Sequence, residues 1–205
     1  MNFDELFWRR VIVSVGGLIY WGGVLIQGRR IRKRIKRSPN LKPKDTRERV
    51  LWAGWMLIIG LWIFQPLFAT PYTHFPPIQI DRSDLNLANL IGGIGLTVAG
   101  YAATLWCYVV MGNAWRIGID RKEKNELVIA APYRWIRHPI YAFQAVMLIG
   151  GVLLVPTTCS LLIVVLHLFF VHVKAKDEEA YLIGVHGDAY RKLMARTGRL
   201  WPKLW

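Results

Sequence analysis

Apolar residues are concentrated in long runs that contain no charged side chain. Residues 50–69, 85–114 and 139–173 hold no Asp, Glu, Lys or Arg. A helix needs about 20 apolar residues to cross the roughly 30 Å hydrocarbon core of a bilayer. A single span must be helical, because lipid offers no hydrogen-bond partners to an open backbone. The pattern therefore predicts an all-α integral membrane protein.

Five transmembrane helices account for this pattern. We expect them at residues 7–27, 50–68, 87–111, 139–155 and 160–173. The last two runs are short and close together, which predicts a tight helical hairpin that turns at or inside the far leaflet. The first run lacks a convincing small-residue cleavage site, so it is expected to be a retained span and not a signal peptide.

The basic residues predict how these spans are oriented. The formal net charge is +14, and residues 28–49 alone hold eleven Lys and Arg against two acidic residues. Residues 112–138 and the tail from Lys174 are also basic, whereas the loop 70–86 has only Arg82. Because basic loops stay in the cytoplasm, a multi-pass protein with its N-terminus outside and its C-terminus in the cytoplasm is expected.

A basic run and a glycine-rich run each allow a second interpretation, which the neighbouring sequence argues against. The basic run at residues 29–37 could suggest nucleic-acid binding, but between two spans it is typical of a topology determinant that touches anionic lipid headgroups. No nucleic-acid partner is expected. The glycine-rich stretch 91–100 superficially resembles a dinucleotide fingerprint, but no strand precedes it. Small residues inside a span more often allow close helix packing.

The cysteines and histidines indicate no metal site. Cys107 and Cys159 are isolated within apolar segments, where cysteine behaves as a small core residue. The histidines lack the spacing of metal ligands. His167 and His172 lie in or near the fifth span, where we expect hydrogen-bonded packing more than catalysis, although ionisable groups at this depth merit testing.

The first segment with candidate chemistry lies before the fourth span. Residues 127–141 are dense in aromatic and cationic side chains at the membrane boundary. Pro139 disfavours helix at His138 and suits the first position of the following helix. The free amides of that helix start, together with Arg137, predict a site for an anion such as a carboxylate.

A second polar cluster follows the fifth span. Lys174 and Glu178 are four residues apart, so on a continuing helix they share one face. Spacing alone leaves open an ordinary solvated charge cluster at a helix exit.

Taken together, these motifs resemble a known family. The motifs are Leu-Val followed by Pro-Tyr-Arg, then Arg137-His138-Pro139-x-Tyr141, Glu178-Glu179-x-x-Leu182 and Gly187-x-x-Tyr190. In this combination, residues 125–200 resemble the isoprenylcysteine carboxyl methyltransferases and their bacterial and archaeal relatives. The resemblance implies that two cytoplasmic segments close over S-adenosylmethionine, beside a lipid-accessible tunnel among the spans.

The resemblance also implies roles for particular residues. The predicted catalytic residues are Lys174 and Arg137, which would orient an acceptor carboxylate. The predicted cofactor-binding residues are Asn125, Leu127, Val128, Tyr133, His138, Pro139, Ile140, Tyr141 and Glu178. Three N-terminal spans (residues 1–111) would then precede a catalytic region (residues 112–205) that ends in an amphipathic helix.

Three positions depart from the family pattern. Lys174 stands where the eukaryotic enzymes have arginine, which keeps the charge but loses the bidentate fork. Phe143 replaces a common glycine, so we expect a phenyl group to narrow or reshape the pocket wall. Ala131 replaces the usual glycine before the Pro-Tyr-Arg element, which is a milder change.

The expected activity is methyl transfer to a lipophilic or lipidated acceptor at the membrane, with carboxyl O-methylation preferred. A phospholipid N-methyltransferase or a small-thiol S-methyltransferase is the first alternative. An NADPH-dependent lipid reductase and a non-catalytic membrane scaffold are the others. The membrane would be the inner membrane of a bacterium or the endoplasmic reticulum of a eukaryote.

Overall fold

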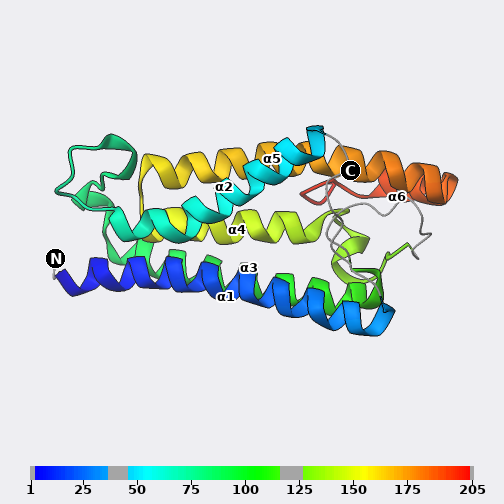
Figure 1. Ribbon diagram of the computed structural model, residues 1–205, viewed down its shortest axis with the longest axis horizontal. Helices are drawn as coiled ribbons and strands as arrows, with labels where there is room; N and C mark the ends of the chain where they lie inside the picture. Colours follow the sequence, from blue (N-terminus) through cyan, green and yellow to red (C-terminus); the bar gives the residue numbers. More distant parts are fainter. Residues whose placement is uncertain (1–2, 37–45, 116–126, 204–205) are drawn as a thin grey trace.

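The computed structural model describes residues 3–36, 46–115 and 127–203, and it confirms the all-α prediction (Figure 1). Six α-helices and four short 3₁₀ turns make up its elements, and the described residues contain no β-strand. The α-helices are α1 (Phe3–Ile35), α2 (Thr46–Phe68), α3 (Leu87–Met111), α4 (Pro139–Leu154), α5 (Thr158–His186) and α6 (Asp188–Arg196).

The predicted spans correspond to α1 to α5. Among the described residues, α1, α2, α3 and α5 are long and apolar enough to cross a membrane. The remaining apolar helix, α4, has only 16 residues. It is joined to α5 by a short turn that begins at Val155, as the predicted hairpin required. The protein is thus a multi-pass integral membrane protein.

Helix ends extend beyond the predicted spans where the sequence becomes polar. The fifth span was predicted to end at residue 173, but α5 runs on to His186. Gly187 then adopts a positive φ of 53°, which glycine tolerates best, and α6 begins. Because α5 is continuous, Lys174 and Glu178 lie one turn apart on the same helix face, as predicted.

Glycines bring α3 and α4 into direct contact. A Cβ atom on Gly93 would lie 2.9 Å from the carbonyl oxygen of Gly150, and one on Gly150 would lie 2.8 Å from that of Gly93. A Cβ on Gly100 would lie 2.7 Å from the carbonyl oxygen of Phe143. The backbones are too close for any larger residue, which confirms that the glycine-rich stretch serves helix packing.

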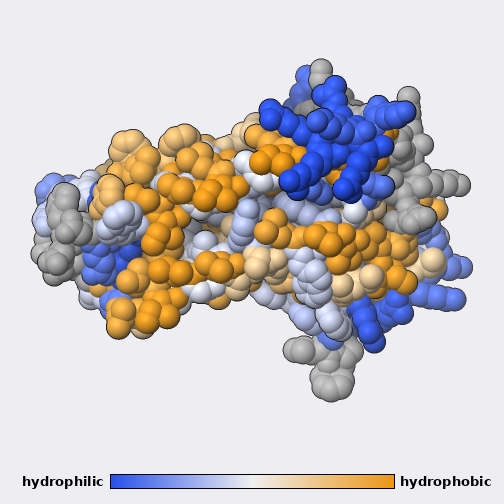
Figure 2. All heavy atoms as spheres, turned by 90° about the horizontal axis from the view of Figure 1, so that it is seen from below, coloured by the Kyte–Doolittle hydropathy of each residue, from blue (hydrophilic) through white to orange (hydrophobic). Residues whose placement is uncertain are grey.

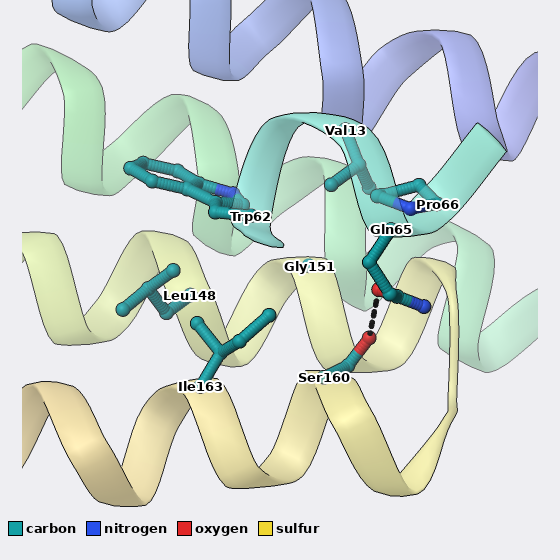
Figure 3. A pocket seen from close by; sticks show the side chains of 8 residues that line it. All are labelled: Val13, Trp62, Gln65, Pro66, Leu148, Gly151, Ser160 and Ile163. Atoms are coloured by element: carbon teal, nitrogen blue, oxygen red, sulfur yellow. Dashed lines mark hydrogen bonds between the residues drawn. The ribbon is translucent and has the colours of Figure 1, made fainter. Parts of the chain in front are cut away.

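The end of the bundle that carries the N-terminus is held by buried polar contacts. Arg9 is fully buried and donates to the carboxylate of Glu5 and to the carbonyl oxygen of Asn86, at 2.8 and 2.7 Å. Nearby, Gln65 on α2 accepts a hydrogen bond from Ser160 at 3.1 Å (Figure 3). Gln65 also donates to Thr157 at 2.9 Å. The void beside this cluster is only about 10 Å³, so this end is tightly packed.

The opposite end of the bundle is basic. α1 and α3 finish there, α2 and α4 begin there, and α6 lies beside them (Figure 1). The hydrophobic surface extends along the bundle, and hydrophilic residues gather most strongly towards this end (Figure 2). The charge segregation seen in the sequence therefore corresponds to a physical separation along the bundle axis.

Candidate active site

The segment before α4 is ordered by the C-terminal segment. The backbone amide of Arg137 donates to the carbonyl oxygen of Gly198 at 2.9 Å, and that of His138 donates to Arg199 at 3.0 Å. The amide of Gly198 donates in turn to Trp135 at 3.2 Å. Two segments about sixty residues apart in the chain thus form one short backbone ladder that fixes where α4 starts.

A buried ion-pair cluster reinforces this ladder. Glu179 is only 3% exposed and accepts from the Nε atom of Arg137 at 2.8 Å. It also accepts from Nε and Nη2 of Arg199, at 3.1 and 2.5 Å. Arg137 donates further to the backbone and hydroxyl oxygens of Thr197. Removing one charge from such a cluster would leave its partner buried and unpaired.

His138 lies between the two motif glutamates. Its Nδ1 atom is 3.2 Å from Oε2 of Glu178, and its Nε2 atom is 3.5 Å from Oε1 of Glu179. Burial disfavours the charged ring, but the attraction of the two nearby carboxylates outweighs it, so the pKa of His138 is raised above its usual value. The other carboxylate oxygen of Glu178 accepts from the Tyr141 hydroxyl at 2.8 Å. Tyr141 also stacks on His138.

These groups line a cavity of about 440 Å³. All predicted site residues that the structure describes contribute to its lining: Leu127, Val128, Tyr133, Arg137, His138, Pro139, Ile140, Tyr141, Lys174 and Glu178. Asn125 lies outside the described residues. The structure therefore brings the two motif segments together around one space.

The far wall of the cavity comes from α1 and α2, which contribute Trp21, Val24, Leu25, Trp52, Trp55, Met56 and Ile59. Three of these side chains are also well exposed: Leu25 (60%), Trp52 (44%) and Met56 (47%). Lys174 faces this wall, with its ammonium 5.7 Å from the ring centre of Trp55. An ammonium over an indole face is attracted by the ring quadrupole.

Several polar atoms of the cavity wall have no hydrogen-bond partner among the described residues. They include the hydroxyls of Tyr133 and Tyr190, and both side chains are buried. Burial is the main cause that raises the pKa of Tyr133 and of Tyr190, so both remain protonated and can donate. Buried polar groups normally find partners, so these two hydroxyls are exceptions within the cavity wall, where each has less than 1 Å² of accessible surface.

Two predictions about individual side chains have different outcomes. Phe143 is not among the residues that line the cavity, so the expected narrowing by its ring is wrong. Two positions beyond Tyr141 on a helix, residue 143 is turned roughly 200° from the cavity face. His167 contacts the carbonyl oxygen of Tyr141 at 3.2 Å and packs against Trp55, which confirms a packing role.

Some residues of this region were missed by the sequence reasoning. Arg199 and Gly198 carry no motif signal of their own, yet they complete the ion-pair cluster and the ladder. Ala131 is the one replaced glycine with a clear consequence, because its φ of 49° is left-handed. The glycine common at this position was a signal for that backbone conformation.

The fold and the site define an all-α integral membrane protein. Its cavity lies at the basic end of an apolar helix bundle and has polar groups on one side and apolar groups on the other. Residues 93–184 match the model of the isoprenylcysteine carboxyl methyltransferase (ICMT) family. This match agrees with the family resemblance predicted from the motifs and supports a membrane carboxyl methyltransferase. It includes the Arg-His-Pro and double-glutamate motifs but ends before Gly187. A search of curated proteins finds no match to the chain.

Proposed function

We propose that the protein is an S-adenosylmethionine-dependent methyltransferase that methylates the carboxylate of a lipophilic acceptor. The observation that carries this proposal is the single cavity in which His138, Glu178 and Lys174 meet beneath the apolar wall of α1 and α2. This cavity combines a polar end, suited to a charged cofactor, with a hydrophobic end, suited to a lipid.

The donor set suits the cofactor. Its ammonium and sulfonium groups need acceptors, which Glu178 supplies, and its carboxylate needs donors, which the start of α4 beside His138 supplies. When bound, S-adenosylmethionine supplies a methyl group already activated on a sulfonium. The residues of this chain need only bind, align and exclude water.

Lys174 is the residue to which we assign the acceptor carboxylate. A carboxylate is ionised at neutral pH and needs no general base, so a cation that fixes its direction is sufficient. Lys174 lies four residues before Glu178 on α5 and faces the apolar wall, between the cofactor end and the lipid end. Arg137 donates hydrogen bonds to Glu179 and Thr197, so we assign it a positioning role.

The position of the apolar wall supports delivery of the acceptor from the membrane. Leu25, Trp52 and Met56 line the cavity and stay well exposed on two helices, α1 and α2, that are long and apolar enough to cross a membrane, so acyl chains could reach this wall. The basic end of the bundle would face the cytoplasm, with its lysines and arginines near anionic headgroups. The acceptor would then enter sideways while the cofactor enters from the cytoplasm.

Calorimetric titration of the purified protein with S-adenosylmethionine and with NADPH tests the cofactor. Binding of the first alone supports the proposal, binding of NADPH favours a reductase, and binding of neither favours a scaffold. A screen of lipid extracts with methyl-labelled cofactor then tests the acceptor. Labelled methyl esters support carboxyl methylation, whereas labelled amines or thioethers would support the other methyltransferases.

The Lys174 assignment is tested with the acceptor that this screen identifies. Lys174→Ala is expected to lower kcat/KM for the acceptor by about tenfold to a hundredfold, because a half-buried charge partner is lost. Lys174→Arg keeps the charge and should retain most of the rate. Equal rates in wild type and Lys174→Ala would remove Lys174 from the acceptor site.

A further inference from the structure

Two aromatic side chains from different helices meet beside Lys174 in the cavity. Trp55 on α2 and Tyr141 on α4 both line it, and they are called the aromatic pair below. Their ring centres are 6.3 Å apart, and the ring planes are inclined at 49°. The ammonium of Lys174 lies 5.7 Å from the ring centre of Trp55 and 5.8 Å from that of Tyr141. One positive charge is thus shared between the two rings.

The aromatic pair offers a ligand carbon surface and few polar atoms. Less than 1 Å² of the Nε1 atom of Trp55 is accessible, although the residue as a whole is only half-buried, so its accessible part is carbon. Tyr141 is also half-buried, and its hydroxyl donates to Glu178 at 2.8 Å. The faces of aromatic rings carry the negative part of the ring quadrupole, so this surface attracts cations.

A cation that has no hydrogen-bond donor fits such a surface best. The ammonium of S-adenosylmethionine carries N–H donors, and we assigned it to the carboxylate of Glu178. The sulfonium carries neither N–H nor O–H, so only charges and ring faces can hold it. Tyr141 joins the two places, because its hydroxyl bonds to Glu178 and its ring belongs to the aromatic pair. Since a short carbon chain separates the ammonium from the sulfonium, an ammonium at Glu178 brings the sulfonium towards the rings.

We infer that the aromatic pair is the binding site of the sulfonium, and that it makes the cavity prefer the methyl donor to the uncharged product. This inference rests on the proposed function, because it takes the cavity as the cofactor site. Lys174 has a long flexible stem, so its ammonium can turn from the rings to the acceptor carboxylate while the sulfonium is bound. S-adenosylhomocysteine has a neutral thioether in place of the sulfonium. The rings do not attract it in this way, which favours its release.

Calorimetric titration of the purified protein with S-adenosylmethionine and with S-adenosylhomocysteine tests the inference. A non-ionic detergent is used, because it supplies no cation that competes for the rings. The two ligands differ by one methyl group and one positive charge, so the ratio of their dissociation constants reports how the site treats that charge. Trp55→Leu should weaken S-adenosylmethionine binding roughly two- to thirtyfold, while the affinity for S-adenosylhomocysteine changes little.

Further variants show whether the ring of Trp55 causes that preference. Trp55→Phe keeps a smaller ring and should retain part of the preference, since phenylalanine attracts a cation less than tryptophan does. Trp52→Leu makes the same chemical change three residues earlier on α2, in the same cavity wall, and should keep the ratio of the wild type. Trp55→Met keeps a long apolar side chain without a ring and serves if Trp55→Leu does not fold.

Three results would overturn the inference. Equal weakening of both ligands in Trp55→Leu would mean that Trp55 only packs, and unchanged affinities would mean that it does not reach the cofactor. An equal change of the ratio in Trp52→Leu would show that the effect does not come from the aromatic pair. Failure of the proposed function looks different, since neither ligand would then bind to the wild type, and the inference would fail with it.

Discussion

The two ends of the helix bundle treat buried polar side chains in opposite ways. At the N-terminal end, Gln65, Thr157 and Ser160 bond to one another and leave a void of only about 10 Å³. At the basic end, the hydroxyls of Tyr133 and Tyr190 have no partner among the described residues, and both residues line a cavity of about 440 Å³.

This difference separates polar groups that hold the fold from polar groups that are suited to a ligand. A satisfied cluster inside an apolar bundle ties helices together, here α2 to the start of α5. Unsatisfied polar groups around a cavity lower the stability of the ligand-free protein, and a ligand that pairs with them recovers that free energy. Substitutions at the two ends should therefore affect different measurements, namely stability at one end and ligand affinity at the other.

The largest expected effect is at the cavity end. Glu178→Ala removes the carboxylate that holds His138 and Tyr141, and it should weaken S-adenosylmethionine binding by about a hundredfold or more, which is about 3 kcal/mol. Calorimetric titration measures the affinity. Asp177→Ala changes the neighbouring residue, which pairs with Arg47 at the surface, and should bind like the wild type. Unchanged affinity in Glu178→Ala would remove this residue from the site.

The tightly packed end should show the reverse behaviour. Gln65→Leu deletes hydrogen bonds to Thr157 and Ser160 and is expected to lower the free energy of unfolding by about 1 to 2 kcal/mol. Affinity for S-adenosylmethionine should not change. Thermal or denaturant unfolding in detergent measures the first quantity and titration the second. A loss of cofactor affinity without a loss of stability would contradict the division between the ends.

The protonation of His138 gives a pH-dependent contribution to stability. Its pKa is raised above 6.5 in the folded protein, so the ring keeps its proton and its pairs with Glu178 and Glu179. A raised folded pKa means that the contribution is complete below about pH 6.5 and is lost as the pH rises through the folded value. Melting temperatures of wild type and His138→Gln should therefore converge as the pH rises. A constant difference would show that folding does not raise the pKa of His138.

The smallest expected effect concerns the turn before the site. Ala131 has a left-handed φ of 49°, which disfavours any residue with a Cβ atom by roughly 1 to 2 kcal/mol. Ala131→Gly should relieve this strain, but glycine loses more conformational entropy on folding than alanine does. The expected net increase in the free energy of unfolding is therefore at most about 1 kcal/mol. Chemical denaturation measures the change. Destabilisation by Ala131→Gly would indicate that the alanine methyl group has a packing role.

The sequence predicted the spans better than the helices. Hydropathy located α3 at residues 87–111 and α4 to within one residue, since both helices end where their apolar runs end. It underestimated α1 and α5, because hydropathy detects the membrane boundary while charged residues continue a helix beyond it. The end of α5 depends on the backbone conformation at Gly187, which hydropathy does not encode.

The site was predictable only where motifs mark it. The family resemblance identified the residues around His138 and Glu178, and α5 brings Lys174 into the same cavity through simple helix spacing. The α1 and α2 wall could not be predicted, because an apolar run does not specify its packing partner. The contact between Arg199 and Glu179 could not be predicted either, since it depends on a turn that reverses the chain after α6.

A structure of the protein with S-adenosylhomocysteine tests the central claim most directly. The account predicts that the bound product contacts His138, Glu178 and Tyr133 in the cavity below the start of α4, with its sulfur towards Lys174. Binding at any other place, or a cavity filled by lipid while the product binds elsewhere, would contradict it.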